Sequence, residues 1–277
     1  MLQRRAQPLL GTLVEVGLRA ECGATAAGLG GDGEEPVDGA LNAALNAALD
    51  AACNAALNAA LNAAFTAAFK ALHEAQAAMS RFDPRSDIAR FNALPRGGRL
   101  QPRRPTLQVL QAAAELQAES DGCFDISLGR APAGWALDGD SLVKLHAAAQ
   151  LDLGGIGKGH AVDLAVQALQ SAGCSAGWVN AGGDLRAFGD LATPVLLRCE
   201  SQGGVRHFAD LQDGAFATSA FGGRHRSRLA GAPDAARHVS VAAPTCLWAD
   251  ALTKVVAARG DIAHPLLARH GAQAWLH

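Results

Sequence analysis

Alternating apolar and polar residues predict a strand close to the start of the chain. Val14, Val16 and Leu18 are apolar at every second position, which is the period of a strand with one buried face. Residues 21–38 are rich in glycine and contain an acidic segment, so we expect a surface loop there. The chain therefore begins with a half-buried strand and continues into a loop.

The next pattern is a helix with an unusual spacing of four. A large apolar residue recurs at every fourth position from Leu41 to Phe69, often followed by Asn, and this defines an Ala-Leu-Asn-Ala repeat over residues 39–64. Because four residues advance about 40° beyond one helical turn, the apolar ridge winds around the helix and one core cannot bury all of it. We expect the N-terminal half to project or fray. The repeat is either an expansion of an ordinary amphipathic helix or a partner-binding helix.

The rest of the chain mixes short strands, glycine turns and helices. We expect helices over residues 106–120, 158–172 and 249–259, and the last two end near a glycine. Strands are expected at 123–127, 151–153, 177–180, 184–188, 194–199, 205–211 and 238–242. This order predicts an α+β fold, in one intertwined domain that spans residues 1–277.

Composition excludes several classes of protein. Hydrophobic residues make up 49% of the 277 residues and charged residues 18%, which is too apolar for a disordered chain. The net charge of −2 gives no field that would attract nucleic acid. We find no signal peptide and no membrane span, so we expect a cytoplasmic location. The six cysteines lack a C-x-x-C pair and are expected to be mostly buried thiols.

The densest candidate site is the segment from Leu151 to Asp163, where an expected strand passes through glycines into a helix. Such a junction points backbone N–H groups at one place, which suits a phosphate. The dinucleotide fingerprint fails because His160 stands where a third small residue belongs, and the Walker pattern fails as well. Lys158 remains a candidate cation for a phosphate or a polyol; the alternative is a structural turn with a solvated lysine.

Three further segments carry polar residues at element ends. Residues 180–184 form a glycine turn that is either part of a site or a simple hairpin. Thr218 and the next residue place two hydroxyls in a strand, and Asp250 opens the last helix. An aspartate in a first helical turn is either a metal ligand or an ordinary complement to the helix dipole.

Taken together and in this order, these segments resemble the FAD:protein FMN transferases, the ApbE family. The resemblance runs from about Pro8 to Trp275, interrupted by the repeat. Its motifs are Pro-Leu-Leu-Gly-Thr at 8–12, Met79 to Asn92, Gly122 to Asp125, Asp152 to Asp163, Asn180 to Asp184, Ala217-Thr-Ser and Ala249 to Lys254. It implies a single ApbE-type, T-fold-like α+β domain, here with a long, repeat-expanded N-terminal helix.

The resemblance also implies an activity. Members transfer the FMN half of FAD to a Thr or Ser hydroxyl of an acceptor flavoprotein subunit, with magnesium, and AMP leaves. Gly155, through its carbonyl, and Asp250 would hold Mg²⁺, and Asp250 and His160 are the candidate catalytic residues. By motif position the FAD site would contain Leu10, Phe82, Cys123, Phe124, Asp125, Asp152 and Lys158, to which we add Thr218. An FAD pyrophosphatase and an FAD-binding protein without turnover are the alternatives.

Three departures from the family pattern leave alternatives open. Lys254 stands at the metal position, four residues after Asp250, where members usually carry a threonine ligand. Its ammonium cannot ligate: it either repels the ion, takes over charge neutralisation at the pyrophosphate, or points to solvent. His160 stands where members often have tyrosine, and it acts as a general base or packs against the cofactor. The arginines from Arg224 to Arg237 either clamp the pyrophosphate or belong to a solvated loop.

Overall fold

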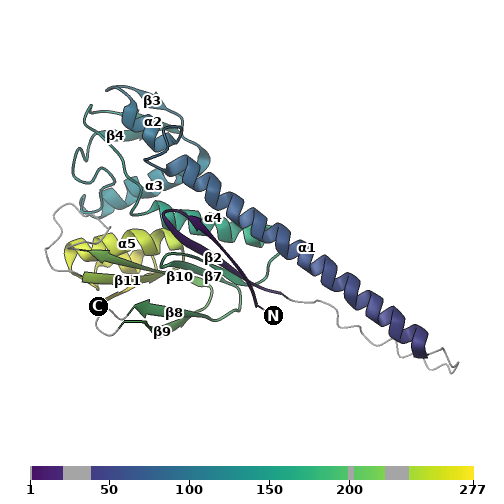
Figure 1. The fold of residues 1–277 in the computed structure, drawn as a ribbon. Helices are drawn as coiled ribbons and strands as arrows, with labels where there is room; N and C mark the ends of the chain where they lie inside the picture. Colours follow the sequence, from purple (N-terminus) through teal and green to yellow (C-terminus); the bar gives the residue numbers. More distant parts are fainter. Residues whose placement is uncertain (1, 21–38, 199–202, 222–236) are drawn as a thin grey trace.

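The computed structural model describes residues 2–20, 39–198, 203–221 and 237–277. The expected glycine-rich loop at 21–38 lies outside these ranges, as do the arginines from 224 to 228. The described chain builds one layered α+β structure from which a single helix projects (Figure 1).

A seven-stranded sheet forms the centre of the fold. Its order is β1-β2-β6-β7-β10-β11-β12, and every neighbouring pair is antiparallel. The strands are β1 (Leu2–Leu9), β2 (Thr12–Arg19), β6 (Gly177–Ala181), β7 (Asp184–Phe188), β10 (Gly214–Phe221), β11 (Arg237–Ala243) and β12 (Gln273–Leu276).

Different elements pack on the two faces of this sheet. Helices α4 (Gly157–Ser171) and α5 (Cys246–Arg259) pack on one face, and the hairpin of β8 (Thr193–Arg198) and β9 (Val205–Leu211) covers the other (Figure 1). Strand β10 shows the alternation, because Ala217 belongs to the main core while Phe216 packs among the residues next to the hairpin. Side chains of β10 therefore alternate between the helices and the hairpin.

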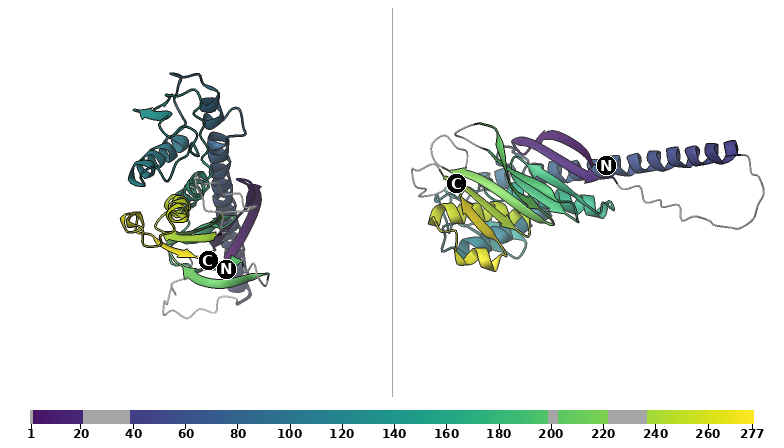
Figure 2. Two further views of the ribbon diagram at one scale, coloured as in Figure 1. Left: turned by 90° about the vertical axis from the view of Figure 1, so that its left-hand side faces the viewer. Right: turned by 90° about the horizontal axis from the view of Figure 1, so that it is seen from below.

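A second helical layer lies beyond α4. Helix α1 (Gly39–Met79) packs along α4 and also contacts α3 (Arg104–Glu119) and α2 (Asp87–Ala93). Figure 2 shows these helices beside a separate small group of strands. That group is β3 (Arg99–Leu100), β5 (Ser141–Lys144) and β4 (Trp135–Asp138), and a short helix, α6 (Pro265–Arg269), precedes β12.

The expected strands at 123–127 and 151–153 are wrong, because both segments are irregular. The carboxylate of Asp125 accepts hydrogen bonds from the backbone N–H groups of Ser127 and Gly129, which folds the chain into a turn instead.

The expectation for the cysteines also fails in part: of the described cysteines Cys246 is buried, whereas Cys53, Cys123 and Cys174 are partly exposed.

The N-terminal half of α1 projects from the domain, as the spacing of four predicts. Leu45 and Leu49 are 64% and 59% exposed, whereas Phe65 and Leu72 are fully buried. With 41 residues the helix spans about 60 Å, and Figure 2 shows its first turns far from the sheet. The winding ridge meets the core only over the last part of the helix.

One helix among the described residues is long and apolar enough to cross a membrane, although no membrane span was expected from the sequence. It is the stretch Ala43–Met79 of α1, whose composition is dominated by alanine and leucine. The C-terminal part of this stretch packs against α4 and α3 in the core, as the core helix of a globular domain does. Length and composition alone are therefore weak evidence for a membrane span here.

We expect residues 44–59 to be dispensable for folding. Their removal takes away four repeat units of α1 that are exposed or at most half-buried, together with the packing of Leu57 against the core and the hydrogen bond from the Gln3 side chain to Asn58. The thermal midpoint should fall by no more than about 4 °C, the shift that roughly 1 kcal/mol causes. Differential scanning calorimetry on the shortened chain checks this, and loss of the cooperative transition would contradict it.

Candidate functional site

Helices α4 and α5 meet at a glycine. A Cβ atom at Gly159 would lie 2.2 Å from the carbonyl oxygen of Cys246, so only glycine permits this approach. The Gly159 N–H donates to Oδ2 of Asp250 on α5, at 3.2 Å. In return Asp163 of α4 accepts from the backbone N–H groups of Cys246 and Leu247 at 2.9 and 2.8 Å. Each helix thus caps the N-terminal end of the other with a carboxylate.

Lys254 lies against the capping carboxylate of α5. Its Nζ donates to Oδ1 of Asp250, to the backbone oxygen of Asp250 at 2.9 Å, and to Oγ of Ser219 on β10 at 3.0 Å. The lysine side chain is only 8% exposed and Asp250 is fully buried. Burial would raise the pKa of Asp250, but Lys254 and the nearby Lys158 outweigh it and lower that pKa, so the carboxylate is charged.

A second, partly buried ion pair lies beside the first. Lys158, in the first turn of α4, contacts the carboxylate of Asp184 at the start of β7. Burial acts to lower the pKa of Lys158, but the carboxylates of Asp184 and Asp250 reverse this and raise it. Lys158 is therefore charged. We call Lys158, Asp184, Asp250 and Lys254 the charge cluster.

A line of contacts leads from the charge cluster to the surface. Gly155 lies against the Lys254 side chain, since a Cβ there would be 3.3 Å from Cε. The neighbouring Gly154 N–H donates to Asp152 at 2.9 Å, and the other oxygen of that carboxylate pairs with Arg81 at 3.1 Å. Arg81 in turn stacks on the ring of Phe82, which is 78% exposed. Asp152 and Phe82 thus lie on one continuous path with Lys254.

The structure places the other expected cofactor residues around this path. The Asp152 N–H donates to Ile126 at 2.8 Å, which brings the turn containing Cys123, Phe124 and Asp125 beside it. In this turn Phe124 is buried, and the carboxylate of Asp125 is occupied by its own turn. Leu10 lies in the β1–β2 turn, and its N–H donates to Gln76 near the end of α1 at 2.6 Å.

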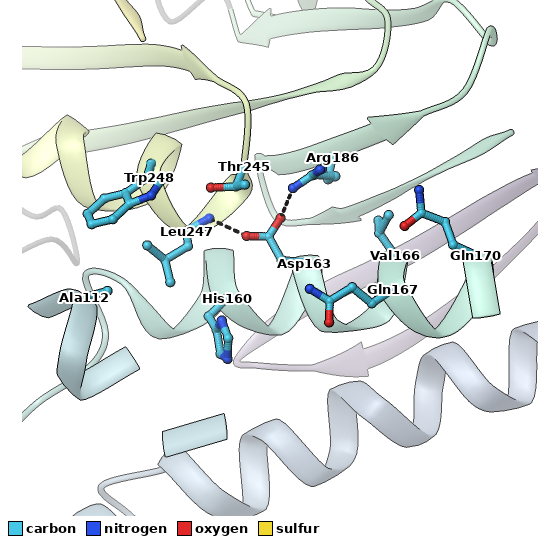
Figure 3. Close-up of a pocket in the computed structure, with 10 residues that line it drawn as sticks. All are labelled: Ala112, His160, Asp163, Val166, Gln167, Gln170, Arg186, Thr245, Leu247 and Trp248. Atoms are coloured by element: carbon cyan, nitrogen blue, oxygen red, sulfur yellow. Dashed lines mark hydrogen bonds and ion pairs between the residues drawn. The ribbon is translucent and has the colours of Figure 1, made fainter. Parts of the chain in front are cut away.

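Two expected site residues lie elsewhere. Thr218 is on the hairpin side of β10, where its hydroxyl bonds to Ser240, because successive strand residues face opposite sides. His160 lines a cavity of about 370 Å³ with Asp163 and Trp248 (Figure 3). Among the described residues its buried Nε2 has no hydrogen-bond partner. Burial lowers the pKa of His160, so its imidazole is neutral at neutral pH.

Four polar residues of this region lie within the motifs quoted from the sequence but were not selected there as site residues: Asp184, Ser219, Asp163 and Arg81. Asp184 ends the glycine turn that was read as either site or hairpin. Ser219 is the neighbour of the hydroxyl that was chosen, and strand alternation was the signal that separates the two. Arg81 lies within the motif from Met79 to Asn92, but its pairing with Asp152 depends on the fold bringing the end of α1 beside that residue.

The sequence profile of the ApbE family matches residues 47–142 and 133–276. The chain belongs to the ApbE family. Among proteins with curated descriptions, none matches it. The expected α+β ApbE fold with a long N-terminal helix is therefore confirmed, whereas the expansion of that helix by repeats stays a prediction.

Solved structures of ApbE proteins share this fold. A flavin transferase ApbE from Vibrio cholerae matches with a TM-score of 0.72 and 18% identity, over 100% of this chain and 93% of that one. The apo flavinyl transferase ApbE of Pseudomonas stutzeri matches at 0.68 and 22%, over 100% and 90%. An ApbE protein of Thermotoga maritima matches at 0.68 and 18%, over 100% and 94%.

The residues of this ApbE protein do not fit the magnesium ion that the family resemblance implies. Both carboxylate oxygens of Asp250 already accept hydrogen bonds, one from Lys254 and one from Gly159. Among the described residues, Oδ1 of Asp184 is a buried oxygen of the cluster without a partner. Magnesium needs oxygen ligands in near-octahedral geometry, and Lys254 places an ammonium, which cannot ligate, against the carboxylate expected to hold the ion.

Proposed function

We propose that this chain transfers the FMN moiety of FAD to a Thr or Ser hydroxyl of an acceptor flavoprotein subunit. The hydroxyl oxygen attacks the FMN phosphorus, the bond to the bridging oxygen of the pyrophosphate breaks, and AMP leaves with that oxygen while the hydroxyl loses its proton. The observation that supports this most is the continuous path from exposed Phe82 through Asp152 to the charge cluster, on an ApbE fold.

The residues on this path match the parts of FAD in chemistry. An exposed aromatic ring with a stacked guanidinium offers a face for a flat ring system, and Asp152 offers a hydrogen-bond acceptor beside it. Lys158 keeps about a third of its side chain exposed, at 34%, at the start of α4. A phosphate group is favoured there by the ammonium charge and by the helix end.

The direct test is incubation of the purified chain with FAD and an acceptor that contains a target threonine. Mass spectrometry should find the acceptor heavier by one FMN residue, with AMP released in equal amount. Free FMN and AMP without a modified acceptor would instead identify an FAD pyrophosphatase, in which water replaces the hydroxyl. FAD that binds and stays intact would contradict both activities.

Asp152→Ala should weaken FAD binding about tenfold, which is the effect of losing roughly 1.4 kcal/mol. The change removes the acceptor that orders Gly154 and pairs with Arg81, so both the loop and the guanidinium lose their position. Titration followed by flavin fluorescence measures the dissociation constant. Asp138→Ala is the matched control, because it removes an exposed aspartate paired with Arg99 away from the path. Equal affinities in the two variants would exclude Asp152 from the site.

A further inference from the structure

We propose that the ammonium group of Lys254 permanently takes the place of a divalent cation in this site, so that the chain binds the diphosphate of FAD without metal. The inference rests on the proposed function for its diphosphate ligand. Its central claim concerns the protein alone, and it is that the position between Asp250, Ser219 and Gly155 is a cation site filled by a side chain.

The contacts of Lys254 are those of a bound cation. An ammonium has three N–H donors, and the three acceptors here are a carboxylate oxygen, a backbone carbonyl oxygen and a hydroxyl oxygen. Oxygen ligands of these kinds are what hard divalent cations bind in proteins. With all three donors engaged at 8% exposure, the ammonium is held in one place and does not reach into solvent.

The charges around Lys254 leave nothing for a second cation to neutralise. Each carboxylate of the cluster already has an ammonium partner, Lys158 for Asp184 and Lys254 for Asp250. A divalent ion placed in this cluster would add its charge beside a buried ammonium, at a separation where like charges repel strongly. A threonine in place of Lys254 would leave Asp250 without its ammonium partner and would add one hydroxyl ligand, which favours such an ion.

The available space agrees with the charge argument. The Lys254 side chain runs past Gly155, with Cε, Cγ and Cδ between 3.3 and 3.7 Å from where a Cβ would stand. The aliphatic part of the lysine therefore fills the volume next to the loop whose carbonyl is the other candidate ligand. An ion could enter only if the lysine left, and leaving would strand Asp250 without its partner.

Binding of Mn²⁺, followed by electron paramagnetic resonance without FAD, tests this directly. Wild type should take up no Mn²⁺ at concentrations that saturate Lys254→Thr, and Lys254→Thr should bind one ion per chain. Lys144→Thr is the matched control, since Lys144 is a buried lysine outside the charge cluster, whose Nζ donates to the backbone oxygen of Asn92. It should bind none. Uptake by wild type, or no uptake by a folded Lys254→Thr, would overturn the proposal.

Titration with FAD in EDTA and in Mg²⁺ extends the test to the ligand. The wild-type dissociation constant should be the same in both, whereas that of Lys254→Thr should be about tenfold weaker in EDTA and recover with Mg²⁺. A wild-type affinity that requires Mg²⁺ would contradict the proposal. If neither protein binds FAD, the proposed function fails, and the Mn²⁺ result still decides whether Lys254 fills a cation site. Lys254→Met, which offers no hydroxyl ligand, covers the case that the threonine variant does not fold.

Discussion

Gly159→Ala should lower the free energy of unfolding by about 3 kcal/mol, in the upper part of the range for overpacked cores. The new methyl group would lie 2.2 and 2.6 Å from the backbone oxygen and carbon of Cys246 and 2.9 Å from Cβ of Asp250. Backbone atoms of α5 cannot rotate away, so the two helices must separate. The gain of up to about 1 kcal/mol from alanine in a helix is too small to offset this. Urea unfolding followed by tryptophan fluorescence gives the value.

Gly157→Ala, two residues earlier in the same helix, is the matched control. There the nearest atom to an added Cβ is Cβ of Leu153 at 3.4 Å, which is ordinary contact. This variant should be as stable as wild type or slightly more stable, because alanine favours the helix. Equal losses at the two positions would show that the helix end, and not its approach to α5, requires glycine.

Asp163→Ala is expected to cost about 3–5 kcal/mol of unfolding free energy, the range for breaking a buried ion pair. The carboxylate accepts from Cys246 and Leu247 and pairs with Arg186 at 2.7 Å, with both side chains largely buried. Its removal leaves two N–H groups and a guanidinium without their acceptor. Figure 3 shows two of these partners, Leu247 and Arg186, converging on the Asp163 side chain.

Asp163→Asn and Asp138→Ala are the control variants for this prediction. The amide of asparagine keeps the shape of the side chain and one acceptor oxygen. Asp163→Asn should therefore lower the unfolding free energy less than Asp163→Ala does. Asp138 pairs with Arg99 at a surface where the side chains are 65% and 59% exposed, and its removal should change stability by less than about 1 kcal/mol. If Asp163→Ala were as mild as Asp138→Ala, the carboxylate would not be holding the end of α5.

Helices α3, α4 and α5 and strands β6 to β9 and β11 lie close to where the sequence predicted them, because glycine turns and apolar runs are local signals. The strands at 135–138 and 141–144 were not predicted. The projection of the long helix followed from the angle between successive residues. The turn at Asp125 did not, since an aspartate that accepts from its own backbone competes with a strand at a position where composition favours the strand. The local sequence pattern does not show whether the turn or the strand is the more stable conformation at Asp125.

The role of each polar residue in the site depends on which residues from distant parts of the chain lie beside it. Lys254 had three possible roles in the sequence, and its burial against Asp250 and Ser219 excludes the solvent-facing one. Thr218 and Ser219 are chemically alike, and their separation required the direction of one strand relative to α5. Chemical type along the sequence indicated the candidates, and packing decided among them.

Because the N-terminal half of α1 projects from the domain, the two parts of the molecule unfold in different ways. Residues near Leu45 and Leu49 make few tertiary contacts, so they unwind by a helix–coil equilibrium that is gradual and noncooperative with the domain. All four tryptophans lie in or against the layered domain, at 135, 178, 248 and 275. Far-ultraviolet ellipticity and tryptophan emission will therefore report different transitions, and only the emission follows the unit that holds the charge cluster.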